Sequence, residues 1–231
     1  MFKKTFSSIA VLLLFLTSIK ADNVTFLMSD FGVTPNSSQN LSKSIDNALR
    51  SIKSKVKSKD HVQIIFDKGT YLLSEEGSVS KELFISNHDQ VNPKNIGLFL
   101  DGWTNLTIDG RGAEFVFDGT MLPIVLQNSK AVTLKDFSID FKNPHIAQVE
   151  VMENRGEDGI VFRAEPWVQG RISEKGQFQP YGLNWSQQVY TGIAFEKGSR
   201  HILYKTSDLN VNLDNSLQLR ADTYYAPKWK D

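Results

Sequence analysis

Cysteine is absent from the 231-residue chain. A chain without thiols forms no disulfides, no thiolate zinc sites and no cysteine nucleophile. The lipid anchor of bacterial lipoproteins, which needs a Cys at the cleavage site, is excluded as well. The fold must therefore be stabilised by a large buried core.

Long apolar runs are also scarce, and the one that stands out lies near the start of the chain. Ile9 to Leu16 is uninterrupted, with Lys3 and Lys4 before it and small residues up to Ala21 after it. Such a run is too short to cross a bilayer as a helix, and its flanks are typical of a secretory signal peptide. We therefore predict a cleaved signal peptide over 1–21. The mature protein is expected to be secreted or periplasmic, with no membrane association after cleavage.

An excess of basic charge is missing too. Removing residues 1–21 leaves 23 basic residues against 26 acidic ones. The one basic run, at Lys53, Lys55, Lys57 and Lys59, fits the solvated end of a helix. A nucleic-acid partner is therefore not expected.

The first structured segment reads as strand, helix, strand. Val24 to Met28 is a short strand, Asn36 to Ser38 offers N-cap residues, and Val62 to Phe66 is an apolar strand followed by a turn at Gly69. Between the strands, apolar residues spaced by three and four predict one apolar helix face: Leu41, Ile45, Ala48, Leu49, Ile52 and Val56. This order resembles the entry to pectate-lyase-like right-handed parallel β-helix proteins, in which such a helix caps the open end of the coil.

A weak internal repeat supports a coil. Residues 105–110 (NLTIDG) align with 131–136 (AVTLKD) at an offset of 26, with apolar positions at Leu106/Val132 and Ile108/Leu134. Rungs of a β-helix typically take about 20 to 30 residues, and each buries its apolar face against its neighbours. We expect brief strands at 115–117, 124–126 and 137–139, with corners at Asp109-Gly110, 118–119 and 128.

The repeat is interrupted after its second copy. A third similar segment, 201–205, lies 70 residues past the second copy, and apolar alternation resembling an unfinished rung continues over 209–219. Between the copies, alternating segments flank Arg155–Gly159 and read as a hairpin, with an aromatic-rich stretch after it. We predict an all-β fold, namely a right-handed parallel β-helix with an N-terminal capping helix and an inserted small antiparallel β-barrel. The expected divisions are 22–143 for the cap and first rungs, 144–198 for the barrel, and 199–231 for a return to the coil.

Two groups of polar residues are candidates for function. Residues 85–90 (ISNHDQ) bring together four side chains able to hydrogen-bond sugar hydroxyls, so substrate-binding roles are predicted for Asn87, His88, Asp89 and Gln90. Corner capping is the competing interpretation of these residues. Among the acids, Asp140 is the catalytic candidate, set against a corner or capping role. The aromatic residues Trp167, Tyr181, Trp185 and Tyr190 have two interpretations, stacking on sugar rings or filling the core of the barrel, and we favour the barrel core.

The segment 85–90, together with NLTIDGRGAEFVFDGTMLPIVLQNSKAVTLKDFSIDF at 105–141, resembles glycoside hydrolase family 110, the α-1,3-galactosidases. The resemblance implies hydrolysis of terminal α-1,3-linked galactose, as in blood-group B or linear glycans, with inversion and with neither metal nor cofactor. Inversion needs two carboxyl groups about 6.5 to 9.5 Å apart, one protonated and one ionised. In the resembling family that pair lies on later rungs, so no catalytic residue is carried over.

Other functions remain open. The chain could be a non-catalytic carbohydrate-binding β-helix fragment. A polysaccharide lyase is suggested only by the shared entry fold, and the dense acidic cluster with calcium that such lyases use is not evident in the sequence. The glycan with terminal α-galactose is the one partner expected, and the oligomeric state is not indicated by the sequence.

Overall fold

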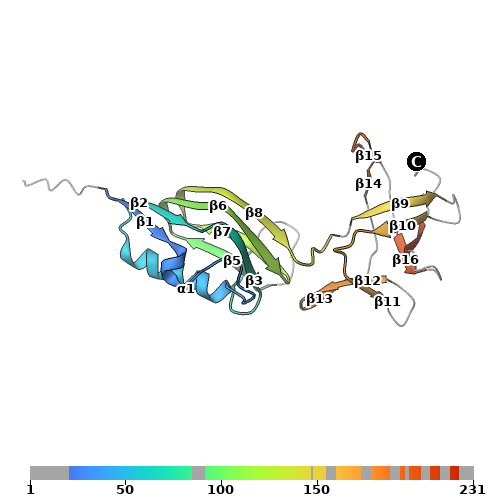
Figure 1. Cartoon of the computed structure of the whole chain (residues 1–231), viewed down its shortest axis with the longest axis horizontal. Helices are drawn as coiled ribbons and strands as arrows, with labels where there is room; N and C mark the ends of the chain where they lie inside the picture. The colour runs from blue at the N-terminus through green and yellow to red at the C-terminus, as the bar shows by residue number, and fades with distance from the viewer. Residues whose placement is uncertain are drawn as a thin grey trace, which may run out of the picture.

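The structure of the chain is a computed structural model (Figure 1). It describes residues 21–84, 92–146, 148–154, 160–172, 178–187, 193–195, 198–203, 209–213 and 219–223. The predicted signal peptide, apart from its last residue, and the whole of segment 85–90 lie outside the described residues.

Strands dominate the described residues, and the expected all-β class is confirmed at that level. The α-helix is α1 (Ser42–Lys55), and a short 3-10 helix, η1, spans Met28–Phe31. The strands are β1 (Asn23–Leu27), β2 (His61–Ile65), β3 (Gly69–Ser74), β4 (Val79–Lys81), β5 (Lys94–Asp101), β6 (Thr104–Asp118), β7 (Met121–Gln127), β8 (Lys130–Phe141), β9 (Val149–Asn154), β10 (Ile160–Ala164), β11 (Gly170–Ile172), β12 (Phe178–Gly182), β13 (Trp185–Ser186), β14 (Ala194–Phe195), β15 (Ile202–Leu203), β16 (Leu209–Leu213) and β17 (Leu219–Thr223).

Residues 21–143, called the parallel part below, contain two sets of parallel strands. In the larger set, β1 pairs with β2, β2 and β3 pair with β6, and β6 pairs with β8. In the smaller set β5 pairs with β7, while β4 joins β5 antiparallel. The predicted repeat is realised as strand register: Leu106 lies opposite Val132 and Ile108 opposite Leu134. The same offset relates β5 to β7, where Asn95 lies opposite Met121.

The corner at Asp109 differs from the expected one. We predicted that brief strands would end there, but β6 and β8 continue through it as strands of 15 and 12 residues. The ladder shifts register between Asp109 and Ala113, and Arg111 has a positive φ of 46°. A bulge therefore turns the chain without ending the pairing.

The core of the parallel part lies between its sheets and α1. The predicted apolar face of the helix is confirmed, because its members from Leu41 to Ile52 are at most 5% exposed and only Val56 is partly buried. The predicted N-cap at 36–38 is wrong: the Ser42 N–H donates to Asn40 Oδ1 at 3.0 Å. Asn36 instead accepts the Thr70 N–H at 3.0 Å and so ties this loop to β3.

Residues 148–223, called the antiparallel part below, pair differently. The predicted hairpin on either side of 155–159 is confirmed, because β9 and β10 pair antiparallel. β11, β12 and β13 form a second antiparallel set, and β14 pairs with β15. In Figure 1 these strands lie together beyond the end of β8, at the right of the view.

The described strands of 199–231 differ from the expected return to the coil. β15, inside the predicted third copy, pairs antiparallel with β14, and β16 and β17 join the sheet of β9 and β10 through β17. Apolar alternation is shared by coil rungs and antiparallel strands that bury one face, so the pattern alone did not separate the two. The predicted boundaries at 144 and 198 remain predictions.

Candidate functional site

The predicted sugar-binding residues Asn87, His88, Asp89 and Gln90 lie outside the described residues, so their roles stay predictions. The described residues on either side of them are held together. The Leu83 N–H donates to the Asn92 side-chain oxygen at 3.2 Å. The segment therefore leaves and rejoins the described fold at neighbouring points beside β4 and β5.

An open hollow of about 330 Å³ lies next to these points, lined by Leu83, Phe84, Leu122, Ile124, Val125, Leu126 and Gln127. The Phe84 side chain is 77% exposed, and Leu126 is 47% exposed. At the rim the Lys81 ammonium donates to Gln127 Oε1 at 2.5 Å. An apolar floor with an aromatic face and a polar rim suits a sugar ring, whose carbon face stacks and whose hydroxyls hydrogen-bond. Phe84 was missed at the sequence level, although it stands directly before the predicted segment.

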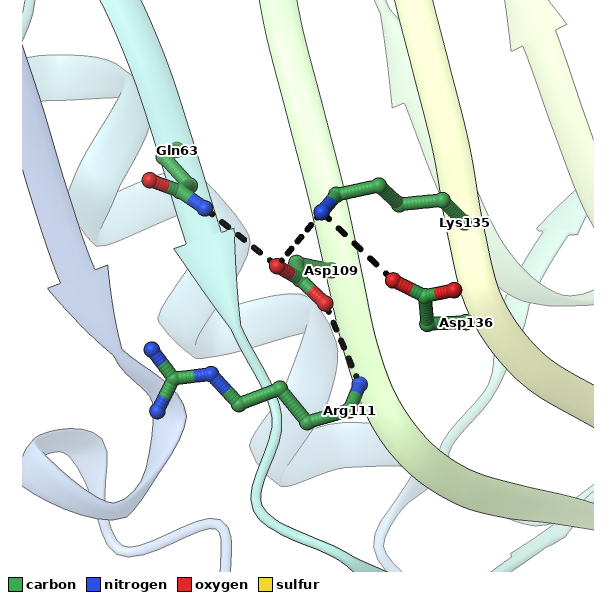
Figure 2. Close-up of polar contacts among 5 residues, drawn as sticks. All are labelled: Gln63, Asp109, Arg111, Lys135 and Asp136. Atoms are coloured by element: carbon green, nitrogen blue, oxygen red, sulfur yellow. Dashed lines mark hydrogen bonds and ion pairs between the residues drawn. The ribbon is translucent and has the colours of Figure 1, made fainter.

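Among the described residues of the parallel part, the carboxylate of Asp109, on β6, has several polar partners (Figure 2). Its Oδ2 forms an ion pair with Lys135 Nζ on β8 at 2.9 Å and accepts a hydrogen bond from Gln63 Nε2 on β2 at 3.4 Å. Its Oδ1 accepts the Arg111 N–H at 3.2 Å. Lys135 Nζ also lies 3.5 Å from Asp136 Oδ2. The cluster thus links three adjacent parallel strands on the face opposite Leu106 and Ile108.

This cluster cannot supply the protonated acid of a glycosidase. The Lys135 hydrogen bond, helped by the Arg111 N–H, lowers the pKa of Asp109 despite its burial. Asp109 in turn raises the pKa of Lys135. A general acid for sugar cleavage needs the opposite shift, a raised carboxyl pKa. Asp109 therefore holds the corner, as expected for an Asp-Gly pair at a turn.

Asp140, the catalytic candidate, lies exposed on β8. Its Oδ1 accepts the N–H of the next residue, Phe141, at 2.7 Å, and its cross-strand partner on β6 is Val116, which is not an acid. The nearby Asp118 is bound by Lys142 Nζ at 2.9 Å. The contact to Phe141 agrees with the capping interpretation, while the catalytic role of Asp140 stays a prediction.

The aromatic residues of the antiparallel part are not uniformly core. Trp167 is 42% exposed and Tyr181 36% exposed, which differs from the barrel-core role that we favoured. The Tyr181 ring faces the Arg171 guanidinium, whose central carbon lies 5.6 Å from the ring centroid, and this contact suits an exposed position. Trp185 is half-buried, and Tyr190 lies outside the described residues.

Two further properties bear on the site. Within the described ranges, no three His, Asp or Glu side chains gather closely enough to hold a metal ion. No described helix combines the length and apolar character needed to cross a membrane.

The described fold thus defines an all-β protein in which parallel sheets are followed by antiparallel ones. A family model described as GLAA-B beta-barrel domain I matches residues 147–228, which cover the antiparallel strands. Curated relatives extend the match across the chain. An alpha-1,3-galactosidase B of Phocaeicola vulgatus is 46% identical over 88% of this chain and 34% of its own length. One from Bacteroides fragilis is 41% identical over 96% of this chain and 37% of its own length.

The chain is therefore a relative of the α-1,3-galactosidases, as its sequence predicted. It spans about a third of the length of the curated relatives it matches.

Proposed function

We propose that this chain is part of a secreted exo-acting α-1,3-galactosidase that removes terminal α-1,3-linked galactose with inversion. The observation that carries the proposal is the 46% identity to a protein named alpha-1,3-galactosidase over 88% of the chain. Blood-group B type and linear galactose-α-1,3-galactose glycans are the proposed substrates.

The parallel part is proposed to be the first turns of a right-handed β-helix capped by α1. The strand register supports this proposal. β2 and β3 pair with β6 at the same residue offset, and β5 pairs with β7 at the offset that relates the first half of β6 to β8. Stacked turns of this kind carry residues from successive strands on one surface, which suits a sugar chain. The hollow beside Phe84, with the predicted residues 87–90, is the proposed sugar contact.

The catalytic acids are proposed to lie in the part of the relatives outside the match. Asp109 is paired with Lys135 and its pKa is lowered, which is unsuited to an acid that must donate a proton. The proposed division of labour is that this chain contributes sugar contacts and the scaffold, while the inverting pair comes from elsewhere.

A chimaera tests the function. The matching third of the Phocaeicola vulgatus relative is replaced by residues 22–231, and galactose release is measured from galactose-α-1,3-galactose and from its α-1,4 isomer. We expect the chimaera to release galactose from the α-1,3 substrate and much less from the α-1,4 isomer. Equal rates on both would remove the linkage claim, and a folded chimaera without activity would contradict the function.

Two further measurements address the finer claims. The anomer first released, read by NMR before mutarotation, should be the β form if the reaction inverts, and the α form would contradict inversion. Phe84→Ala in the chimaera should raise KM several-fold with a smaller change in kcat, because a stacking contact binds substrate and transition state alike. Leu27→Ala, which also removes a partly exposed apolar side chain but lies outside the hollow, is the matched control.

Export is a separate proposal. N-terminal sequencing of the protein recovered outside the cytoplasm of an expressing bacterium should begin within a few residues of Asp22. Recovery of the chain in the cytoplasm with Met1 retained would contradict it.

A further inference from the structure

Glu75 lies just past the end of β3, where its backbone is held firmly. The Ser74 N–H donates to Ser42 Oγ at 2.9 Å, and that hydroxyl donates to the Ser74 carbonyl at 2.8 Å. The Glu75 carbonyl then accepts the Ser78 N–H at 3.1 Å in a tight turn. The first turn of α1 therefore fixes the place from which the Glu75 side chain extends.

The Glu75 carboxylate joins the two parts of the molecule. Its Oε1 accepts the Thr120 N–H at 2.5 Å, and its Oε2 accepts Asn184 Nδ2 at 2.8 Å, from a residue 109 positions away. Gly119 makes room for it: a Cβ there would lie 2.6 Å from Glu75 Cγ, and the φ of Gly119 is +108°. A side chain at position 119 would both strain the backbone and displace the carboxylate.

A ring contact lies beside this bridge. The His145 and Trp185 ring centroids are 4.3 Å apart, and His145 Nε2 lies 3.3 Å from Thr120 Oγ1. Thr120 thus contacts Glu75 through its backbone and His145 through its hydroxyl. Asn184 and Trp185 are neighbours on the hairpin formed by β12 and β13, so both contacts hold the same element.

We propose that Glu75, Thr120 and Asn184, together with the His145–Trp185 ring pair, form a latch. This latch holds the β12–β13 hairpin against the edge of the parallel part where β3 ends and β6 turns into β7. The latch fixes the orientation of the antiparallel part relative to the parallel sheets. Glu75 acts as a positioning residue, because both of its carboxylate oxygens are already hydrogen-bonded to protein groups.

Individually these contacts are modest, since exposed hydrogen bonds contribute little each. Their effect is expected to be cooperative, because the contacts at Asn184 and Trp185 hold one hairpin turn and Thr120 connects Glu75 with His145. Trp185 Nε1 is buried and has no hydrogen-bond partner among the described residues, an arrangement that costs stability unless neighbouring contacts offset it. The indole is thus held there by packing against His145 and by the bridge at Asn184.

The test measures orientation in the full chain. Because the chain has no cysteine, Ser138→Cys on β8 and Met152→Cys on β9, both at exposed positions, give one clean spin-label pair. Pulsed electron–electron double resonance then reports the distribution of distances between the two spin labels, one in each part. With the latch intact we expect one narrow distribution. Glu75→Ala should widen it at least twofold, while a distribution unchanged by that substitution would overturn the proposal.

Three further variants make the result specific. Asn184→Gly removes the amide but keeps the positive φ of 57° that this turn residue adopts, so it should widen the distribution as Glu75→Ala does. The double variant should widen it no further, because both changes break one bridge. Glu114→Ala is the matched control, since Glu114 accepts the Thr70 hydroxyl at 3.0 Å within the parallel part. Equal widening by Glu114→Ala would overturn the latch in favour of general loosening.

Discussion

The parallel and antiparallel parts of this chain bury their apolar side chains very differently. The buried hydrophobic residues lie in the parallel part, with Val161 as the one exception among the described residues. Most of the exposed large hydrophobic side chains lie after residue 143, including Ile146, Met152 and Phe195. A stacked parallel arrangement closes a core around itself, whereas each small antiparallel sheet leaves one face to be covered by something else. The parallel part is therefore expected to be the more stable of the two.

The largest expected effect comes from the aromatic centre of the parallel part. Phe115 is fully buried. Its ring centroid lies 5.0 Å from that of Phe66, 5.5 Å from that of Tyr71 and 5.3 Å from that of Phe137. Phe115→Ala should cost about 3–5 kcal/mol in the free energy of unfolding. Phe195→Ala, in the antiparallel part at 57% exposure, should cost no more than about 0.5 kcal/mol. Urea unfolding of both variants measures the two losses in the free energy of unfolding. Equal losses would contradict the difference in burial between the parallel and antiparallel parts.

A corner glycine gives the next largest effect. A Cβ on Gly110 would lie 2.5 Å from Phe137 Cβ and 2.7 Å from the Asp136 carbonyl oxygen. Gly110→Ala should therefore cost about 1–3 kcal/mol through overpacking. A Cβ on Gly198, in the antiparallel part, would meet no atom of the described residues within 4 Å, so Gly198→Ala should leave the melting temperature within about one degree. A neutral Gly110→Ala would show that adjacent strands of the parallel part are less tightly packed than the structure indicates.

Asp109 gives a smaller effect that depends on pH. Its pKa in the folded protein is lowered, mainly by Lys135, so its ionised form stabilises the fold at pH values above the unfolded carboxyl pKa near 3.8. This contribution is lost as the pH falls through the lowered, folded-state pKa. Asp109→Asn should therefore destabilise the chain at pH 6 and much less at pH 2. Chemical unfolding at the two pH values measures the difference, and a pH-independent loss would contradict the charge pairing.

The smallest effect concerns His145, between the two parts. Desolvation lowers its pKa below 6.5, with Glu75 opposing the shift, so the neutral ring is the form that the folded state favours. Its contribution to stability is then present above pH 6.5 and is lost as the pH falls from there through the lowered, folded-state pKa. His145→Gln should lower the melting temperature slightly at pH 7.5 and less at pH 5.5. A larger loss at the lower pH would show that the protonated ring is the favoured one.

Features with a local signal were predictable from the sequence. The spacing of Ile45, Leu49 and Ile52 predicted the buried face of α1, and the likeness of 105–110 to 131–136 predicted the register of the first half of β6 against β8. Both signals lie within short stretches whose periodicity is set by helix or strand geometry.

Features that depend on distant residues were not predictable. The pairing of β16 and β17 with the sheet of β9 and β10 was missed, because the apolar alternation over 209–219 equally fits a coil rung. The bridge from Glu75 to Asn184 leaves no pattern at either position, since a glutamate after a strand and an asparagine in a turn are both common. Phe84 is the exception, because an aromatic residue directly before the predicted sugar-binding segment 85–90 could have been noticed.

Galactose release by the chimaera that carries residues 22–231 tests the proposed function most directly. We predict hydrolysis of galactose-α-1,3-galactose at a rate within about tenfold of the parent relative, a loss of no more than about 1.4 kcal/mol in transition-state stabilisation. A chimaera that unfolds cooperatively yet releases no galactose would contradict it.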